Sequence, residues 1–151
     1  MKLIRSKPRR LYELSEKECK AIMDAGAKAI INTYPTGNKG YSVAVLTDQG
    51  NIYPGVSYNS DTQSLTMHGE AVALAHAAVH GEKNVVAITG PNCHICKQLL
   101  WESSLKSGIE IVIVLHEEGL IKQIPISELM PYPWPDSALV TSGKPDADGR
   151  H

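Results

Sequence analysis

The sequence contains few of the features that mark secreted or membrane proteins. It has no phenylalanine, only 5% aromatic residues and only three cysteines among 151 residues. No apolar run approaches the roughly eighteen residues that a membrane-spanning helix needs, and the basic residues 1–10 are not followed by the apolar segment of a secretory signal. These absences predict a soluble protein located in the cytoplasm.

The cysteines do not suggest a disulfide framework. Their number is odd, and Cys93 and Cys96 are separated by only two residues, whereas disulfide-rich secreted domains carry an even set. Metal binding or redox chemistry is the better hypothesis for this pair. The third cysteine, Cys19, lies in a helical pattern and is expected to be an inert thiol.

The chain has almost no net charge. Fifteen Lys and Arg against sixteen Asp and Glu give a formal net charge of −1, which makes nucleic acid an unlikely partner. Positive charge gathers only near the start, at Lys2, Arg5, Lys7, Arg9 and Arg10. We expect this basic N-terminal arm, residues 1–14, to be solvated, with phosphate binding as the alternative.

Length and composition predict a single domain of α/β class. The 151 residues, 42% of them hydrophobic, suffice for one core but not for two. Because aromatic residues are scarce, Ala, Val, Ile and Leu must fill this core, which is typical of helices packed on a sheet. We assign the domain to residues 15–130 and a Pro-rich, largely irregular tail to residues 131–151.

Three segments have helical patterns. Ser15 and Glu18 match a capping box, and apolar residues recur with helical spacing through residue 32. Residues 69–80 are apolar nearly all round, so this helix is expected to be buried. Residues 93–107 form the third predicted helix, which closes near Gly108.

Five short segments have strand patterns, at residues 41–46, 52–56, 85–89, 110–115 and 120–124. A turn at residues 48–50 joins the first two into a hairpin. The turn at residues 116–119 is too short to hold a crossover helix, so the last strand is predicted to run antiparallel to its neighbour. Residues 127–130 follow as one helical turn.

Two predicted helices begin with residues that bind metals. His68 and Glu70 open one helix, and Cys93 and Cys96 open the next. The positive end of a helix lowers the pKa of a thiol and stabilises its thiolate. Two thiolates and one imidazole suit Zn²⁺ and leave a fourth position for water, whose pKa the metal lowers toward about 7. Glu70 is then free to carry protons, although a structural zinc or free thiols are the alternatives.

A histidine, any residue and a glutamate, followed by a Cys-x-x-Cys pair, is the pattern of zinc deaminases. The chain from Tyr41 to Leu129 resembles the cytidine deaminases, including the small blasticidin S deaminases. Four short stretches carry the resemblance: Leu46–Gly50, His68–Glu70, Cys93–Gln98 and Ser127–Leu129. The resemblance implies a three-layer α/β/α sandwich around a five-stranded mixed sheet, one catalytic zinc per subunit and a homo-oligomer, either a dimer or a tetramer.

The resemblance also implies a role for each site residue. His68, Cys93 and Cys96 would hold zinc, and a zinc-bound hydroxide would attack a ring carbon of the substrate. Glu70 would shuttle protons from the attacking water to the ring nitrogen and the departing ammonia. The backbone N–H groups of Gly69 and Cys93 would orient substrate and water. An antiparallel last strand is similar to the cytidine deaminase branch, because the branch of tRNA adenosine deaminases has a helix before that strand.

The sequence departs from the family pattern around the substrate. Asn92 separates Pro91 from Cys93, and we expect it to cap the helix that follows. The ribose-binding Asn-x-Glu of the family aligns with Ser57-Tyr58-Asn59, so the carboxylate that binds the sugar in that family is missing here. The family's aromatic residue that packs on the pyrimidine aligns with about Lys39. The interval from Glu70 to Cys93 is also shorter than is usual.

These departures widen the range of substrates. Ser57, Asn59, Gly69 and Lys39 are the predicted substrate contacts. Because a missing polar contact changes selectivity by factors of about 10⁴ or more, the predicted substrate is a cytosine-containing nucleoside, a free base or a nucleoside-like metabolite. The alternatives are a non-catalytic protein that binds such a ligand, and a deaminase that edits nucleic acid, which would need a basic and aromatic groove.

Overall fold

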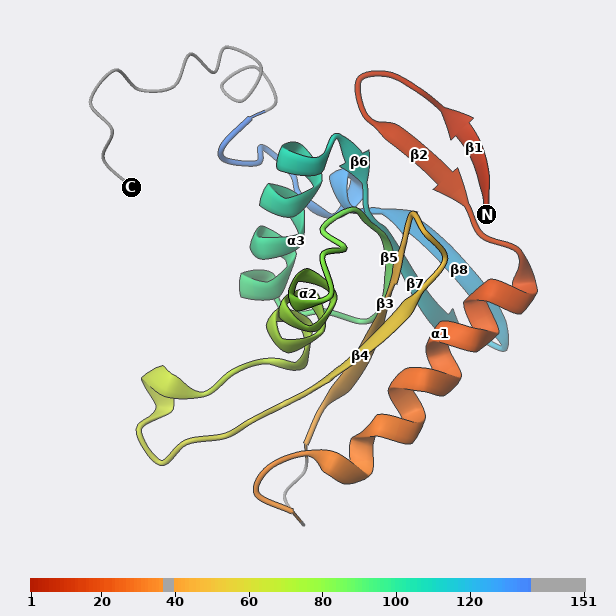
Figure 1. Cartoon of the computed structure of the whole chain (residues 1–151). Coiled ribbons are helices and arrows are strands. Elements are labelled where there is room, and N and C mark those ends of the chain that lie inside the picture. The colour runs from red at the N-terminus through yellow and green to blue at the C-terminus, as the bar shows by residue number, and fades with distance from the viewer. Residues whose placement is uncertain (37–39, 137–151) are drawn as a thin grey trace.

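A five-stranded sheet forms the centre of the molecule (Figure 1). The computed structural model describes residues 1–36 and 40–136. The strand order is β4-β3-β5-β7-β8. These strands are β3 (Ser42–Thr47), β4 (Ile52–Val56), β5 (Val85–Thr89), β7 (Val112–Glu117) and β8 (Leu120–Pro125). All five strands predicted from the sequence are therefore present, two with the predicted bounds and three with ends shifted by one or two residues.

The sheet is mixed, as the sequence predicted. β5 and β7 are parallel, and the other neighbours in the sheet are antiparallel. The antiparallel pairing of β8 with β7 is confirmed, from Val112 opposite Pro125 to Glu117 opposite Leu120. Glu118 and Gly119, which join the two strands, have φ angles of 51° and 79°, and positive values at both positions are typical of a tight hairpin turn.

Helices cover both faces of the sheet and make three layers (Figure 1). α1 (Glu16–Ala29), continued by the 3-10 turn η1 (Ile30–Asn32), lies on one face, and α2 (Gly69–Val79) and α3 (His94–Ser107) lie on the other. Side chains of β3 alternate between the layers, because successive strand residues point to opposite faces. Val43 and Val45 pack toward α2 and α3, whereas Ala44 and Leu46 pack toward α1.

The helix boundaries follow from local chemistry. The predicted capping box is present at α1, because the backbone N–H of Ser15 donates to Glu18 Oε2 at 2.8 Å and the backbone N–H of Glu18 donates to Ser15 Oγ at 3.3 Å. α3 ends at Gly108, whose φ of 67° is accessible to glycine at little cost. The segment after Gly108 forms two strands, β6 (Ile109–Glu110) and β7, where the sequence predicted one.

α2 lies unusually close to β4. A Cβ atom at Gly55 would come within 2.1 Å of the Gly69 carbonyl oxygen and 2.3 Å of the Ala73 nitrogen. Only glycine at position 55 therefore permits this backbone-to-backbone approach. This close approach sets the distance between the sheet and the first turn of α2, which contains Glu70. His68, directly before α2, is placed together with that turn.

The expectation of a solvated N-terminal arm holds in part, because Lys2, Arg5 and Lys7 are exposed, but Arg9 is buried and the arm is folded. The arm forms a hairpin of β1 (Lys2–Arg5) and β2 (Arg10–Glu13), and β2 pairs in parallel with β6. The physical reason is Glu110, which is fully buried and forms an ion pair with Arg9 at 2.6 Å. Sequence patterns could not reveal this pair, since its members are about a hundred residues apart.

The chain beyond β8 packs on α3. η3 (Ile126–Leu129) is the predicted single helical turn, and residues 131–136 contain no helix or strand. The Gln98 side chain donates to the Trp134 carbonyl at 2.6 Å, and the Trp101 indole donates to the Pro135 carbonyl at 2.7 Å. The remainder of the predicted tail, residues 137–151, lies outside the described residues. Among the described helices, none combines the length and the apolar character needed to cross a membrane.

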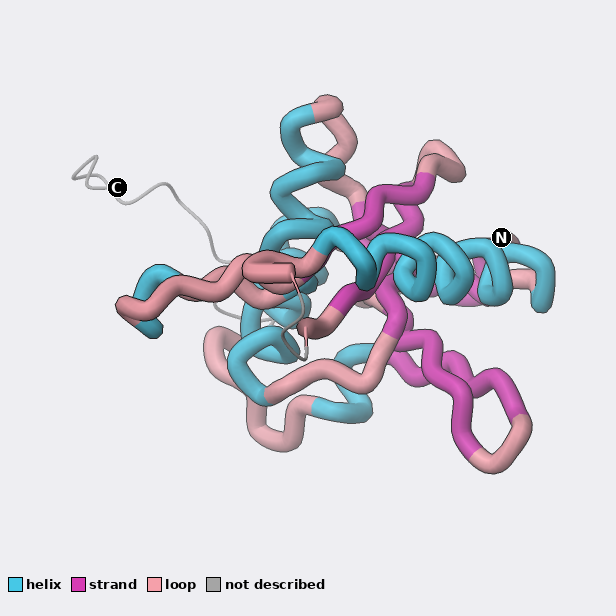
Figure 2. Tube along the Cα trace, turned by 90° about the horizontal axis from the view of Figure 1, so that it is seen from below, coloured by secondary structure: helices cyan, strands magenta, loops and turns pink. Residues whose placement is uncertain are grey.

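The segment between β4 and α2 is the most prominent projection of the described chain. It contains the short 3-10 turn η2 (Gln63–Leu65), which the sequence did not predict. Figures 1 and 2 both show this segment extending away from the sheet. Its two sides are joined by paired backbone hydrogen bonds between Tyr58 and Met67 at 3.0 and 2.9 Å. The segment leads directly into His68.

Candidate metal centre and pocket

The three predicted metal ligands lie together at the starts of two helices. His68 is the N-cap residue of α2, and Cys93 is the N-cap residue of α3. His68 Nδ1 lies 3.5 Å from Cys93 Sγ and 3.3 Å from Cys96 Sγ. Among residues 1–36 and 40–136, these three side chains are the ones whose donor atoms lie close enough together to hold a metal ion. The three donor atoms are all within 4.8 Å of one another.

This donor set fits a tetrahedral zinc ion. Zinc bonds of about 2.3 Å to sulfur and about 2.0–2.1 Å to nitrogen give a sulfur-to-nitrogen edge of about 3.5–3.6 Å in a tetrahedron. The two observed separations are close to that edge. Cys96 is buried, whereas His68 and Cys93 are exposed, so the trio is open on one side, as a catalytic site requires.

The protonation of Cys96 differs from the sequence-based expectation. Burial raises the pKa of the Cys96 thiol, and the neighbouring Cys93 and Glu70 raise it further. The helix terminus was expected to lower the pKa of these thiols, but for Cys96 burial and negative neighbours outweigh it. A divalent cation reverses this balance, because it stabilises the thiolate directly.

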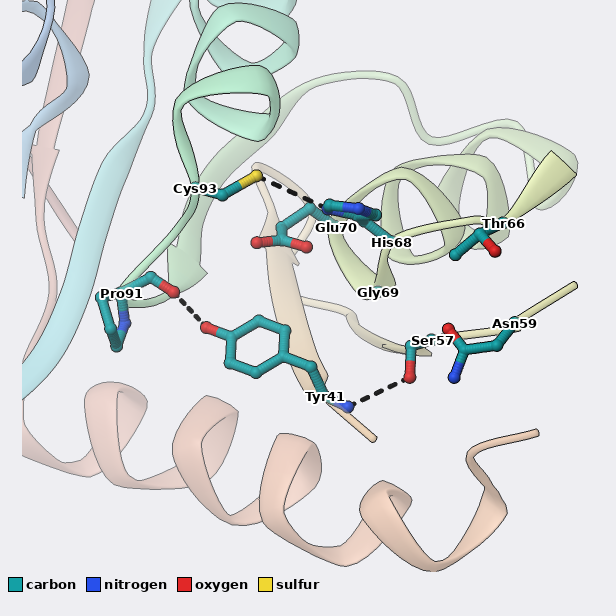
Figure 3. Close-up of a pocket in the computed structure, with 9 residues that line it drawn as sticks. All are labelled: Tyr41, Ser57, Asn59, Thr66, His68, Gly69, Glu70, Pro91 and Cys93. Atoms are coloured by element: carbon teal, nitrogen blue, oxygen red, sulfur yellow. Dashed lines mark hydrogen bonds between the residues drawn. The ribbon is translucent and has the colours of Figure 1, made fainter. Parts of the chain in front are cut away.

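Glu70 is the carboxylate beside the metal ligands. It lies in the first turn of α2 and is 2% exposed. One carboxylate oxygen, Oε1, accepts a hydrogen bond from Asn92, whereas Oε2 is buried and has no partner. Figure 3 shows the carboxylate beside His68 and Cys93, on the side of the Tyr41 ring. A buried oxygen without a partner is costly, which indicates that a ligand completes the site.

Asn92 does not cap α3 as expected. The cap is Cys93, whose sulfur accepts from the Cys96 backbone N–H at 3.5 Å. The Asn92 side chain instead turns inward, is 6% exposed and donates to Glu70. No local sequence pattern signals this contact, because it joins the first turn of α2 to a residue 22 positions away, just before α3.

A cavity of about 330 Å³ opens beside the metal ligands (Figure 3). The predicted contacts Ser57, Asn59 and Gly69 line it together with His68 and Glu70. The sequence analysis missed three further lining residues, Tyr41, Thr66 and Pro91. Lys39, the remaining predicted substrate contact, lies outside the described residues.

Tyr41 forms one wall of the cavity. Its backbone N–H donates to Ser57 Oγ at 3.1 Å, and its hydroxyl donates to the Pro91 carbonyl oxygen. Burial raises the pKa of the Tyr41 phenol to about 12, and the neighbouring acidic groups Glu70, Cys96 and Cys93 add to the shift. Tyr41 is therefore a neutral aromatic wall at physiological pH. The alignment with the family had placed the aromatic position two residues earlier.

The rest of the wall is polar but uncharged. Ser57 is buried and accepts from Tyr41, and the Thr66 hydroxyl accepts from the Ser60 backbone N–H at 3.0 Å. Asn59 also lines the cavity, and among the described lining residues Glu70 is the sole carboxylate. Apart from Glu70 and the proposed metal ligands, the described wall therefore offers uncharged hydrogen-bonding groups.

The chain is similar in structure to bacterial cytidine deaminases. No protein-family model matches the sequence, and no curated protein matches it. The cytidine deaminase from Burkholderia pseudomallei is 20% identical, with a TM-score of 0.66 over 80% of this chain and 100% of that one. The enzyme from Mycobacterium leprae is 22% identical, with a TM-score of 0.62 over 74% of this chain and 96% of that one. For the enzyme from Bacillus anthracis the identity is 20%, the TM-score is 0.59, and the coverage is 83% and 99%.

These similarities establish the fold. The resemblance to cytidine deaminases, which short motifs suggested, is confirmed for the three-dimensional arrangement of nearly the whole length of those proteins. Identities of 20–22% do not by themselves transfer a substrate. The residues of the site therefore have to indicate the function.

Proposed function

We propose that this protein is a zinc-dependent hydrolase that deaminates a small aminated heterocycle, such as a cytosine-containing nucleoside. The observation that carries the proposal is one buried carboxylate, Glu70, placed beside a His68, Cys93 and Cys96 donor set at the edge of an open cavity. The cytidine deaminase fold supports the same class of reaction.

His68 would hold the metal through Nδ1, and Cys93 and Cys96 would hold it through their sulfur atoms. When bound, zinc supplies a Lewis acid that lowers the pKa of water toward about 7. Glu70 is not required as a ligand, because two thiolates and one imidazole already form a common catalytic zinc site.

The net reaction adds the oxygen of water to the ring carbon that carries the amino group and breaks the bond from that carbon to nitrogen. One proton of the water goes to the adjacent ring nitrogen, and the other goes to the departing nitrogen, which leaves as ammonia. Glu70 is positioned to carry both protons, since its Oε2 is buried and has no protein partner. General acid–base catalysis of this kind contributes about 10²–10⁴-fold to the rate.

The cavity walls suggest how the substrate is held. We assign the Tyr41 ring to packing against the heterocycle, and Ser57 and Asn59 to its polar substituents. The backbone N–H groups of Gly69 and Cys93, at the starts of two helices, would orient substrate and water. The neutral lining favours a free base, a nucleoside or a nucleoside-like metabolite.

The experiment is a screen of aminated bases, nucleosides and nucleoside antibiotics for ammonia release. Glu70→Gln should lower kcat by about 10²–10⁴-fold and retain one zinc per chain. Glu118→Gln, in the exposed β7–β8 turn, is the matched control and should leave kcat unchanged.

Each of the other possible outcomes of these measurements would indicate a different function. Silence of the wild-type protein across the panel would reject the enzyme, and tight binding of a nucleoside without ammonia release would identify the non-catalytic alternative. That alternative draws support from Asn59, which stands where the family has a sugar-binding carboxylate. Salt-dependent binding to single-stranded nucleic acid would instead point to an editing enzyme.

We also propose a homo-oligomer, a dimer or a tetramer, as the resemblance implies. Exposed large apolar side chains support this, because Ile31, Tyr34, Tyr58, Leu65 and Met67 are all exposed in the single chain. Light scattering of the purified protein measures the state directly, and a monomer at micromolar concentration would reject the proposal. The cytoplasmic location stays a prediction of the sequence.

A further inference from the structure

Asn92 makes two hydrogen bonds with one nitrogen. Its Nδ2 donates to the Thr89 carbonyl oxygen at 3.1 Å and to Glu70 Oε1 at 3.1 Å. Both partners accept hydrogen bonds, so the nitrogen rather than the oxygen of the amide must face them. The orientation of the Asn92 side chain is therefore fixed by its neighbours.

This pair of bonds links the two halves of the site. Glu70 belongs to α2, whereas Asn92 directly precedes Cys93 at the start of α3 and is tied to the end of β5 through Thr89. Asn92 thus brings an amide donor from the start of α3 to the carboxylate on α2.

Asn92 is the hydrogen-bond partner of Glu70 Oε1, and Oε2 is buried without a hydrogen-bond partner. The Cys96 thiol also interacts with this carboxylate. Because the Cys96 sulfur is a proposed metal ligand, we expect Asn92 to be the contact that restrains rotation about the side-chain bonds of Glu70. A misplacement of about 1 Å costs an enzyme about 10²-fold in rate.

We propose that Asn92 is a positioning residue, which holds Glu70 through Oε1 and leaves Oε2 directed to the reactants. The inference rests on the proposed function for its catalytic consequence, but the contact itself does not. Two experiments separate these parts.

The first experiment measures the contact through stability. In zinc-loaded protein, Asn92→Asp places two carboxylates together without a donor and should lower the unfolding temperature. Adding Glu70→Gln restores a donor and an acceptor, so the double variant should unfold at least about 2 °C above Asn92→Asp alone. Equal unfolding temperatures would overturn the proposal, whether or not any compound is deaminated.

The second experiment measures kinetics on the best substrate of the screen. Asn92→Ala should lower kcat about 10²-fold, with KM and the zinc content per chain unchanged. In the Glu70→Gln background the same change should have no further effect on kcat, because Asn92 acts through Glu70. A rise in KM or a loss of zinc would overturn the proposal, since Asn92 would then contact substrate or merely shape the metal loop.

A matched control is available elsewhere in the fold. The Asn84 side chain donates to Asp48 Oδ2 at 3.0 Å, outside the site. Asn84→Ala removes the same kind of bond and should leave kcat unchanged. If it lowers kcat as much as Asn92→Ala does, the loss reflects general destabilisation and the positioning role is rejected.

Discussion

At Gly55, α2 meets the sheet through backbone atoms. The space that a Cβ would need is taken by the Gly69 carbonyl oxygen and the Ala73 nitrogen, at 2.1 and 2.3 Å. Neither atom belongs to a flexible side chain, so the helix itself would have to move. Gly69 lies between His68, a proposed metal ligand, and Glu70, the proposed proton carrier. The placement of both side chains therefore depends on the absence of a side chain at Gly55.

Gly55→Ala should therefore damage the site as well as the fold. Overpacking typically costs about 1–3 kcal/mol, and displacement of α2 should lower the affinity for zinc, measured by titration against a competing chelator. Gly50→Ala, in the β3–β4 turn, is strained by its φ of 85° but has open space around it. This control should lose stability and bind zinc normally, and an equal loss of zinc affinity in both variants would contradict the argument.

At the scale of elements, the N-terminal hairpin is attached by one buried ion pair. Arg9 is buried, lies over the Trp101 ring at 4.7 Å and contacts Glu110 at 2.6 Å. Arg5 contacts the same carboxylate at 3.4 Å, but its side chain is 41% exposed. The two arginines thus make similar contacts in different surroundings.

Arg9→Ala should destabilise the protein by about 3 kcal/mol or more, because it leaves the Glu110 charge buried and without its closest partner. Arg5→Ala should cost at most about 1 kcal/mol, as expected for an exposed pair. Chemical denaturation measures both values. Equal losses for the two variants would show that burial of the pair does not control how the hairpin is held.

The elements that the sequence predicted are those specified by local patterns. The capping box at Ser15, the alternation in β3 and the short β7–β8 turn each lie within a few residues, and so do the metal donors at His68, Cys93 and Cys96. The contacts that were not predicted from the sequence join segments that are far apart along the chain. β2 depends on Glu110, and the role of Asn92 depends on Glu70 in another helix, so neither has a local signature.

At the scale of the whole molecule, Glu110 joins the beginning, middle and end of the described chain. It accepts from Arg9 in the hairpin and from the Ser127 backbone N–H in η3 at 2.9 Å. Burial acts to raise the pKa of Glu110, but the bonds from Ser127 and Arg9 outweigh it and hold that pKa below its usual value of 4.5. A carboxylate whose pKa is lowered on folding stabilises the protein above its unfolded pKa.

Acidification should therefore lower the stability of the protein, in part because Glu110 becomes protonated. Its contribution is complete above about pH 4.5 and is lost as the pH falls through the lower pKa of the folded state. Glu110→Gln should be less stable than wild type at neutral pH, and the difference should shrink on acidification. Unfolding curves between neutral pH and pH 3 test this, and a difference that grows on acidification would contradict the sign.

The side chains that line the cavity determine how ligand binding depends on ionic strength. None of the described residues that line it is a lysine or an arginine, so none of them attracts an anionic ligand over a distance. Dissolved ions screen attraction between charges, with a Debye length of about 8 Å at physiological concentration. Affinity for a neutral ligand should hence be the same in dilute and concentrated buffer, and the described lining offers a phosphate ester no lysine or arginine with which to pair.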